Sequence, residues 1–247
     1  MKLLVLAAGY ATRLKPLTDK TAKPLLPVAS RPMIDHVLGK FADSSAIDQI
    51  FVVTNHRYAD DFRAWAAEHG GSFGQKPLVV VDDGTTSNDD RLGAIGDMDF
   101  VIRTSHIDDD LIVVAGDNLF SDSLSGFVEQ AQKRGVLVGV YDVGSLVEIR
   151  KYNNLGLDEE GRITHFEEKP VSPTSTLTAI ALYHYPRAVV PKVATYLASG
   201  GNPDQPGRFV QWLYPQLPCF TYRVHGIWLD IGSHETYDEA QRLFRSS

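Results

Sequence analysis

Cysteine is nearly absent from this chain of 247 residues: Cys219 stands alone, which excludes an internal disulfide and a cysteine-rich metal site. No apolar run approaches the ~18 residues of a membrane span. The apolar start, Met1 to Ala8, is interrupted by Gly9 and followed by cations, so it indicates a buried strand and not a signal segment. These absences favour a cytoplasmic protein without a membrane partner.

An excess of basic residues is also missing. The 24 Lys and Arg are outnumbered by 31 Asp and Glu, which gives a net charge of −7. Nonspecific nucleic-acid binding draws on many Lys and Arg contacts with phosphate, so we expect no nucleic-acid partner. Net charge says nothing about one pocket, and a local basic site for a small phosphate ligand remains compatible with it. The 43% of hydrophobic residues excludes a disordered chain.

Short apolar runs alternate with amphipathic helical patterns through the first half of the chain. Strands are expected at 3–6, 50–53, 78–81, 111–114 and 136–141, and helices at 33–41, 58–68, 93–104 and 124–133. This alternation predicts an α/β fold, with a Rossmann-like, mostly parallel or mixed sheet flanked by helices. Ligands collect at the carboxyl ends of such strands, so the loops after Leu6 and Val114 are the candidate sites.

The rhythm changes after about residue 142. Strands are expected at 155–157, 163–167, 177–185, 219–224 and 227–230, with a hairpin turn at 158–161 and helices at 186–198, 210–214 and 234–244. No linker of charged or Gly/Ser-rich sequence separates two units, and no internal repeat occurs. We therefore expect one domain, 1–247, whose second half adds mixed strands.

The loop after the first strand is built of small residues. Ala7, Ala8 and Gly9 would let backbone N–H groups approach a phosphate, and Arg13 and Lys23 would add positive charge. Neither a Walker A sequence nor G-x-G-x-x-G is present. From these residues alone, a strand-to-helix turn with two surface cations is the alternative.

Three other segments carry candidate acidic or basic groups. Asp117 follows an apolar strand, at the crevice where a ligand would lie, and the alternative is that it caps a turn or a helix. Asp230 can equally cap a turn before Gly232, and Glu168-Lys169 can be an exposed charged turn. The aspartates of segment 82–90 fail the calcium-loop spacing, and the eight histidines show no zinc-binding spacing.

Leu6 through Pro27 resembles the signature of sugar-phosphate nucleotidyltransferases, L-A-[AG]-G-x-[GA]-T-R-L-x-P-L-T followed by K-P-L-L-P. The resemblance continues in the family's order at Gly116-Asp117-Asn118, Gly156, Phe166-Glu167-Glu168-Lys169-Pro170, Leu182-Tyr183 and Trp228-Leu229-Asp230-Ile231-Gly232. It is nearest to glucose-1-phosphate thymidylyltransferase-like enzymes, which join a sugar 1-phosphate to a nucleoside triphosphate and release pyrophosphate with Mg²⁺. It implies the nucleotide-diphospho-sugar transferase fold, a single domain here without a C-terminal β-helix.

The resemblance also implies roles for individual residues. Arg13 and Lys23 would be catalytic, and Asp117 and Asp230 would hold Mg²⁺. The nucleotide-binding residues implied are Leu6, Ala7, Ala8, Gly9, Tyr10, Ala11, Thr12, Arg13, Lys23, Asn88 and Gly93. The sugar-phosphate-binding residues implied are Asn118, Gly156, Glu168 and Lys169. Residues 1–141 would form the nucleotide-binding half and 142–247 the sugar-phosphate-binding half.

Two departures from the family pattern leave the substrates open. Ala11 replaces a frequent glycine and disfavours a positive φ. Segment 82–96 replaces the Q-P-x-G-x-[AG]-x-A-like sequence that reads the base, although Asn88 and Arg91 remain candidate contacts. The alternatives are a cytidylyltransferase for phosphocholine or another non-sugar phosphate, and a noncatalytic nucleotide-sugar-binding regulatory protein. A homo-oligomer is compatible with each.

Overall fold

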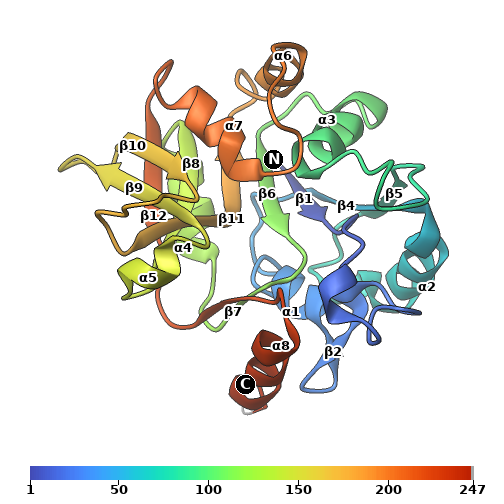
Figure 1. Ribbon diagram of the computed structural model, residues 1–247. Helices are drawn as coiled ribbons and strands as arrows, with labels where there is room; N and C mark the ends of the chain where they lie inside the picture. Colours follow the sequence, from blue (N-terminus) through green and yellow to red (C-terminus); the bar gives the residue numbers. More distant parts are fainter. Residues whose placement is uncertain (246–247) are drawn as a thin grey trace.

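A seven-stranded sheet crosses the middle of the molecule in the computed structural model, which describes residues 1–245 (Figure 1). From one edge to the other its strands are β12 (Cys219–Arg223), β8 (Val136–Asp142), β11 (Leu177–Tyr185), β6 (Leu111–Ala115), β1 (Lys2–Leu6), β4 (Gln49–Thr54) and β5 (Leu78–Asp82). The four strands from β6 to β5 run parallel. Their carboxyl ends therefore meet at one edge of the sheet.

β11 makes the sheet mixed, because it runs antiparallel to both of its neighbours, β6 and β8. β8 in turn pairs with β12 in parallel. Strands from the two halves of the sequence are thus interleaved: β11 lies between two strands of the first half, and β8 between two strands of the second.

Helices cover both faces of the sheet because alternate residues of its strands point to opposite sides. In β1, Leu3 and Val5 belong to the core under α1 (Met33–Gly39), α2 (Ala59–His69), α4 (Ser125–Ala131) and α8 (His234–Leu243). Leu4 belongs to the opposite core, under α3 (Ala94–Thr104), α6 (Lys192–Ala198) and α7 (Pro206–Leu213). Within residues 1–245, no helix has both the length and the apolar character to cross a membrane.

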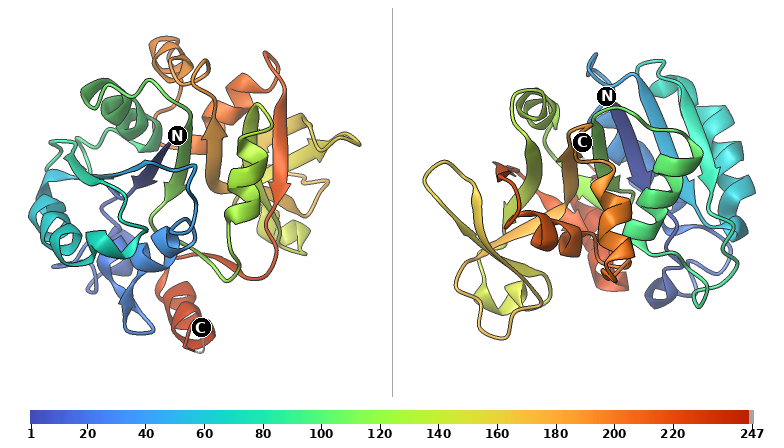
Figure 2. Two further views of the ribbon diagram at one scale, coloured as in Figure 1. Left: turned by 180° about the vertical axis from the view of Figure 1, so that it is seen from behind. Right: turned by 90° about the horizontal axis from the view of Figure 1, so that it is seen from above.

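Three two-stranded sheets flank this framework: β2 (Pro27–Val28) with β3 (Arg31–Pro32), β7 (Asn118–Phe120) with β13 (Trp228–Asp230), and β9 (Asn153–Leu157) with β10 (Ile163–Glu168). The short helix α5 (Leu146–Ile149) precedes β9. Seen from above, the β9–β10 hairpin projects from the sheet (Figure 2). The β7–β13 pair joins residues far apart in the sequence and brings Asp230 opposite Asn118.

The predicted α/β class is confirmed, and most expected elements are present within one or two residues. The helix expected at 186–198 is wrong in its first turns: α6 begins only at Lys192, because Pro186 and Pro191 favour turns before it. The short helix expected at 210–214 begins earlier, with Pro206 in the first turn of α7. Asp117 caps no helix, since strand β7 follows it directly.

Candidate functional site

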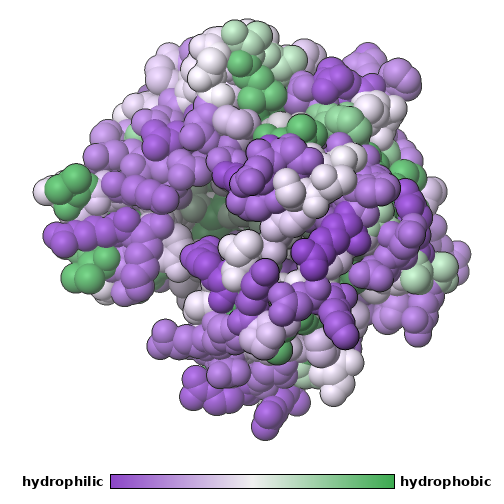
Figure 3. Space-filling view, turned by 45° about the vertical axis from the view of Figure 1, so that its right-hand side comes forward, coloured by the Kyte–Doolittle hydropathy of each residue, from purple (hydrophilic) through white to green (hydrophobic). Residues whose placement is uncertain are grey.

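A cavity of about 740 Å³ is lined by the ends of β1 and β6, by α3 and by segments from the second half. Figure 3 shows a hollow with an apolar floor and a hydrophilic rim on the face of the molecule turned toward the viewer. Ten of the predicted site residues line the cavity: Leu6, Ala8, Gly9, Arg13, Gly93, Asp117, Asn118, Glu168, Lys169 and Asp230. Residues separated by more than 200 positions in the sequence therefore meet in one site.

The loop after β1 closes into a short 3₁₀ helix, Thr12–Leu14, that presents Arg13 to the cavity. Ala11 lies just before this helix with φ +46°, so it adopts the conformation that alanine disfavours. Thr18 Oγ1 donates a hydrogen bond to the Ala11 carbonyl over 2.9 Å and holds the turn. Ala7, Tyr10, Ala11 and Thr12 support the loop without lining the cavity, and the hydroxyl of Tyr10 lies 3.2 Å from Thr85 Oγ1.

The cations of the site differ in their partners. Lys23 forms an ion pair with Asp117 and donates to the Ile231 carbonyl over 3.0 Å, so its ammonium group is engaged below the cavity. Arg13 and Lys169 line the cavity and form no ion pair within residues 1–245. Their charged groups are therefore available to contact an anionic ligand in the cavity.

Asp117 and Asp230 approach one another through the β7–β13 pair. Asn118 Nδ2 lies 3.1 Å from Asp117 Oδ1 and 3.5 Å from Asp230 Oδ1, so one amide group donates to both carboxylates. The amide is oriented from behind, since Trp228 Nε1 donates to Asn118 Oδ1 over 2.8 Å. A backbone bond of 3.1 Å from the Ile231 N–H to the Asp117 carbonyl fixes the register.

These two carboxylates suit a divalent cation. Burial and the neighbouring charge of Asp117, opposed by the charges of Lys23 and Arg13, together raise the pKa of Asp230 to about 6. A cation between the carboxylates would relieve this repulsion. No group of three or more metal-binding side chains occurs in the described part of the chain. Two carboxylates are a donor set compatible with Mg²⁺, which uses one or two carboxylates and keeps waters and phosphate oxygens.

Glu168 and Lys169, at the end of β10, form another part of the wall. Burial raises the pKa of Glu168, and the positive charges of Arg208 and Lys169 oppose that rise. Lys169 adopts φ +50° and its backbone N–H donates to the Tyr152 carbonyl over 2.8 Å, which ties the hairpin to the segment before β9. The wall thus offers one acceptor and one cation side by side.

Two predicted contacts lie elsewhere. Asn88 is exposed and accepts a bond from Arg91 Nη1 through its carbonyl over 2.6 Å. Gly156 lies inside β9, where an added Cβ would be 3.1 Å from His165 Cβ, and the cavity is lined instead by Asn153, three residues earlier. The contact of Gly156 with the sugar phosphate, which the family resemblance implies, stays a prediction.

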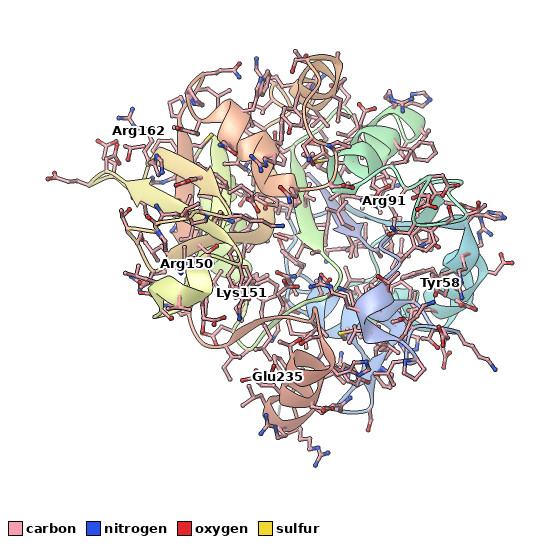
Figure 4. The ribbon with its side chains drawn as sticks, in the orientation of Figure 1. Tyr58, Arg91, Arg150, Lys151, Arg162 and Glu235 are labelled. Atoms are coloured by element: carbon pink, nitrogen blue, oxygen red, sulfur yellow. The ribbon has the colours of Figure 1, made fainter. Side chains whose placement is uncertain are left out.

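Sequence reasoning also missed several wall residues, namely Asp97, Glu148, Lys151, Tyr152, Asp204, Trp228 and Glu235. Figure 4 shows Arg91 on the side of α3, and Lys151 and Glu235 on the opposite side. Arg91 Nη2 and Asp204 Oδ2 are 2.9 Å apart, so this ion pair joins the loop before α3 to the loop before α7. The cavity is therefore closed on that side by residues from both halves.

Comparison with known proteins bears on the whole chain. A family model for "Nucleotidyl transferase" matches residues 2–247. The UTP–glucose-1-phosphate uridylyltransferase of Synechocystis is 27% identical over 98% of this chain and 63% of its own length. The glucose-1-phosphate thymidylyltransferase of Streptomyces griseus is 30% identical over 98% of this chain and 66% of its own length. The chain thus spans about two thirds of these two relatives.

A solved structure agrees with the sequence relatives. A Bacillus anthracis protein, described as a glucose-1-phosphate thymidylyltransferase and crystallised with sucrose, superposes with a TM-score of 0.81 at 25% identity. The match covers 100% of this chain and 96% of the other. The family match, the shared fold and the converging residues lead to one conclusion: the chain belongs to the nucleotidyl transferase family.

Proposed function

We propose that this protein transfers a nucleotidyl group from a nucleoside triphosphate to a sugar 1-phosphate, with release of pyrophosphate, in a Mg²⁺-dependent reaction. The observation that carries the proposal is the convergence of Arg13, Lys169 and the Asp117–Asp230 pair on one cavity. A phosphate oxygen of the sugar phosphate attacks the α-phosphorus, and the bond from that phosphorus to the bridging oxygen of pyrophosphate breaks. Both substrates are polyanions, so the reaction depends on positioning and charge stabilisation.

Arg13 and Lys169 contact different substrates in this proposal. Arg13 presents a planar guanidinium, which suits bidentate contact with the triphosphate and offsets charge on the leaving pyrophosphate. Lys169 binds the phosphate of the sugar 1-phosphate and lowers its repulsion from the triphosphate. Glu168, beside it, accepts hydrogen bonds from sugar hydroxyls. Lys23 neutralises Asp117 from below, so it tunes the carboxylate that holds the cation.

Asp117 and Asp230 would hold Mg²⁺, and Asn118 would keep the two carboxylates oriented. When bound, Mg²⁺ supplies positive charge at the phosphoryl oxygens on which negative charge accumulates. Their sequence separation of more than a hundred residues makes the site dependent on the complete fold. In this proposal, the pairing of β7 with β13 serves to bring the two metal-binding carboxylates together.

The proposed activity is tested by assaying each nucleoside triphosphate with each acceptor. Purified protein with Mg²⁺ is incubated with ATP, CTP, GTP, UTP or dTTP and a panel of sugar 1-phosphates, with phosphocholine as a further acceptor, and pyrophosphate release is measured. We expect turnover with at least one sugar 1-phosphate. Turnover with phosphocholine alone would favour the cytidylyltransferase alternative. Tight nucleotide-sugar binding without any turnover would favour the noncatalytic one.

A further inference from the structure

Asp97 is a buried acid of the cavity wall that the proposed reaction does not use. It lies in the first turn of α3, is 6% exposed and lines the cavity. Asp83, 8% exposed, lies against it. Asp97 Oδ1 and Asp83 Oδ2 are each buried and receive no hydrogen bond from any donor in residues 1–245. Two carboxyl groups in contact satisfy such atoms by sharing a proton.

The environment favours this shared proton. Burial, together with the charge of Asp83 and the hydrogen bond to it, raises the pKa of Asp97 to about 8. Asp83 is held as the acceptor, because its Oδ1 already receives the Thr85 N–H over 2.7 Å. At neutral pH the proton of Asp97 is therefore directed to Asp83.

One oxygen of Asp97 remains for the cavity. Its Oδ1 faces the shared proton, and no hydrogen bond among the described residues reaches Oδ2. With its proton committed to Asp83, Asp97 presents only an acceptor to a ligand. Asp97 lines the cavity, so an N–H group of a ligand would replace water as the donor to Oδ2.

The wall beside this acceptor is backbone. The Asp97 N–H donates to the Gly93 carbonyl over 2.7 Å, and a Cβ on Gly93 would lie 2.7 Å from the Pro203 carbonyl oxygen. The position of a Gly93 side chain is filled by the Pro203 backbone and Asp204, so Gly93 lines the cavity with backbone alone. α3 packs on β1 and β4, and in Figure 1 it lies on the opposite side of the molecule from β10, the strand that Lys169 follows. With phosphates at Arg13 and Lys169, the α3 wall is left for the nucleoside.

We propose that Asp97 selects the nucleobase by accepting a hydrogen bond from an exocyclic amino group, so that ATP, CTP or GTP binds in preference to UTP or dTTP. This inference rests on the proposed function, because that function puts a nucleoside triphosphate in the cavity. Adenine, cytosine and guanine each carry an amino group. Uracil and thymine carry carbonyl oxygens on both sides of their ring N–H, and these oxygens oppose a second acceptor.

Binding of the five nucleoside triphosphates, measured by titration calorimetry with Mg²⁺, tests the proposal directly. We expect at least one amino-bearing triphosphate to bind about tenfold more tightly than UTP and dTTP, the difference of one buried hydrogen bond. In Asp97→Asn, the amide donates to Asp83 and keeps an oxygen toward the cavity, so the preference should persist. In Asp97→Leu the acceptor is gone, and the preference should fall to within about twofold.

Asp99→Leu is the matched control, since Asp99 lies on the same helix but pairs with Arg103 outside the cavity. Asp97→Ala, which leaves room for water beside Asp83, carries the same expectation as Asp97→Leu and replaces it if that variant does not fold. Tighter binding of UTP or dTTP to the unaltered protein, or an unchanged preference in Asp97→Leu, would overturn the role of Asp97 and leave nucleotidyl transfer intact. Binding of none of the five would overturn both proposals.

Discussion

Trp228 Nε1 donates a hydrogen bond to Asn118 Oδ1 over 2.8 Å, and this bond decides which way the amide of Asn118 points. With Oδ1 occupied, Nδ2 is directed to Asp117 and Asp230. Trp228 consequently orients the two carboxylates through the amide of Asn118. Groups of this kind commonly change metal affinity when they are replaced.

Trp228→Phe should raise the Mg²⁺ concentration needed for half-maximal rate by about tenfold, because the amide of Asn118 is no longer fixed. Phenylalanine keeps an aromatic ring against Tyr141 and Tyr152, so the fold should be retained. The rate is measured against Mg²⁺ concentration, with Trp212→Phe as the control. An identical Mg²⁺ dependence in the two variants would show that Trp228 does not position the carboxylates.

Asp117→Ala should reduce pyrophosphate release by at least about a hundredfold, since the proposed ligand of Mg²⁺ and the partner of Lys23 are both lost. Circular dichroism should report an unchanged fold, because Asp117 lies on the rim of the cavity and is partly exposed. Glu129→Ala, on the exposed surface of α4, is the control for loss of a carboxylate. Near-normal rates in Asp117→Ala would remove this residue from the metal site.

The raised pKa of Asp97 predicts how stability depends on pH. Between pH 4 and about 8 the folded state keeps a proton on Asp97 that the unfolded state has released. The contribution of Asp97 to stability therefore falls as pH rises through this window, by at most about 1.4 kcal/mol per pH unit for one proton. Urea unfolding without metal or nucleotide should give a steeper decline for the unaltered protein than for Asp97→Asn. Parallel curves would show that Asp97 titrates normally.

Two glycines with similar φ angles differ in what an added side chain would contact. Gly93 and Gly84 have φ +81° and +79°, but an added Cβ meets the Pro203 carbonyl oxygen at 2.7 Å only at Gly93. Gly84→Ala should cost about 1 kcal/mol of unfolding free energy through strain alone. Gly93→Ala should cost a further 1–3 kcal/mol, roughly, because the neighbouring backbone must move. Equal losses in urea unfolding would contradict the close contact at Gly93.

Local signals in the sequence predicted the strands and one side of the site. The apolar run before Gly9 located β1 and its loop, and the run before Gly116 located β6 and hence Asp117. Asp230 came from resemblance alone, because its position depends on the β7–β13 pair and no local pattern encodes a pairing between residues over a hundred positions apart. The position of β11 between β6 and β8 is likewise determined by pairing between distant segments, so no local pattern in the sequence predicts it.

The acids on the α3 side were missed for another reason. Asp97 lies one turn before Val101 on the apolar side of α3, between Ile95 and Met98. A polar residue at such a position is the available signal of a buried partner or ligand. Its partner Asp83 follows strand β5, whereas Asp97 lies on α3. Only the folded arrangement therefore brings the two carboxyl groups together to share a proton.

The interleaving of β8 and β11 also bears on synthesis at the ribosome. A nascent chain that ends before Leu177 has made β6 and β8, yet each still has an open edge where β11 belongs. Open strand edges recruit other chains, so this interval of translation is when the protein is most exposed to misassembly. Slow codons or a pause just after β8 would prolong the interval, and rapid translation through Tyr185 would shorten it.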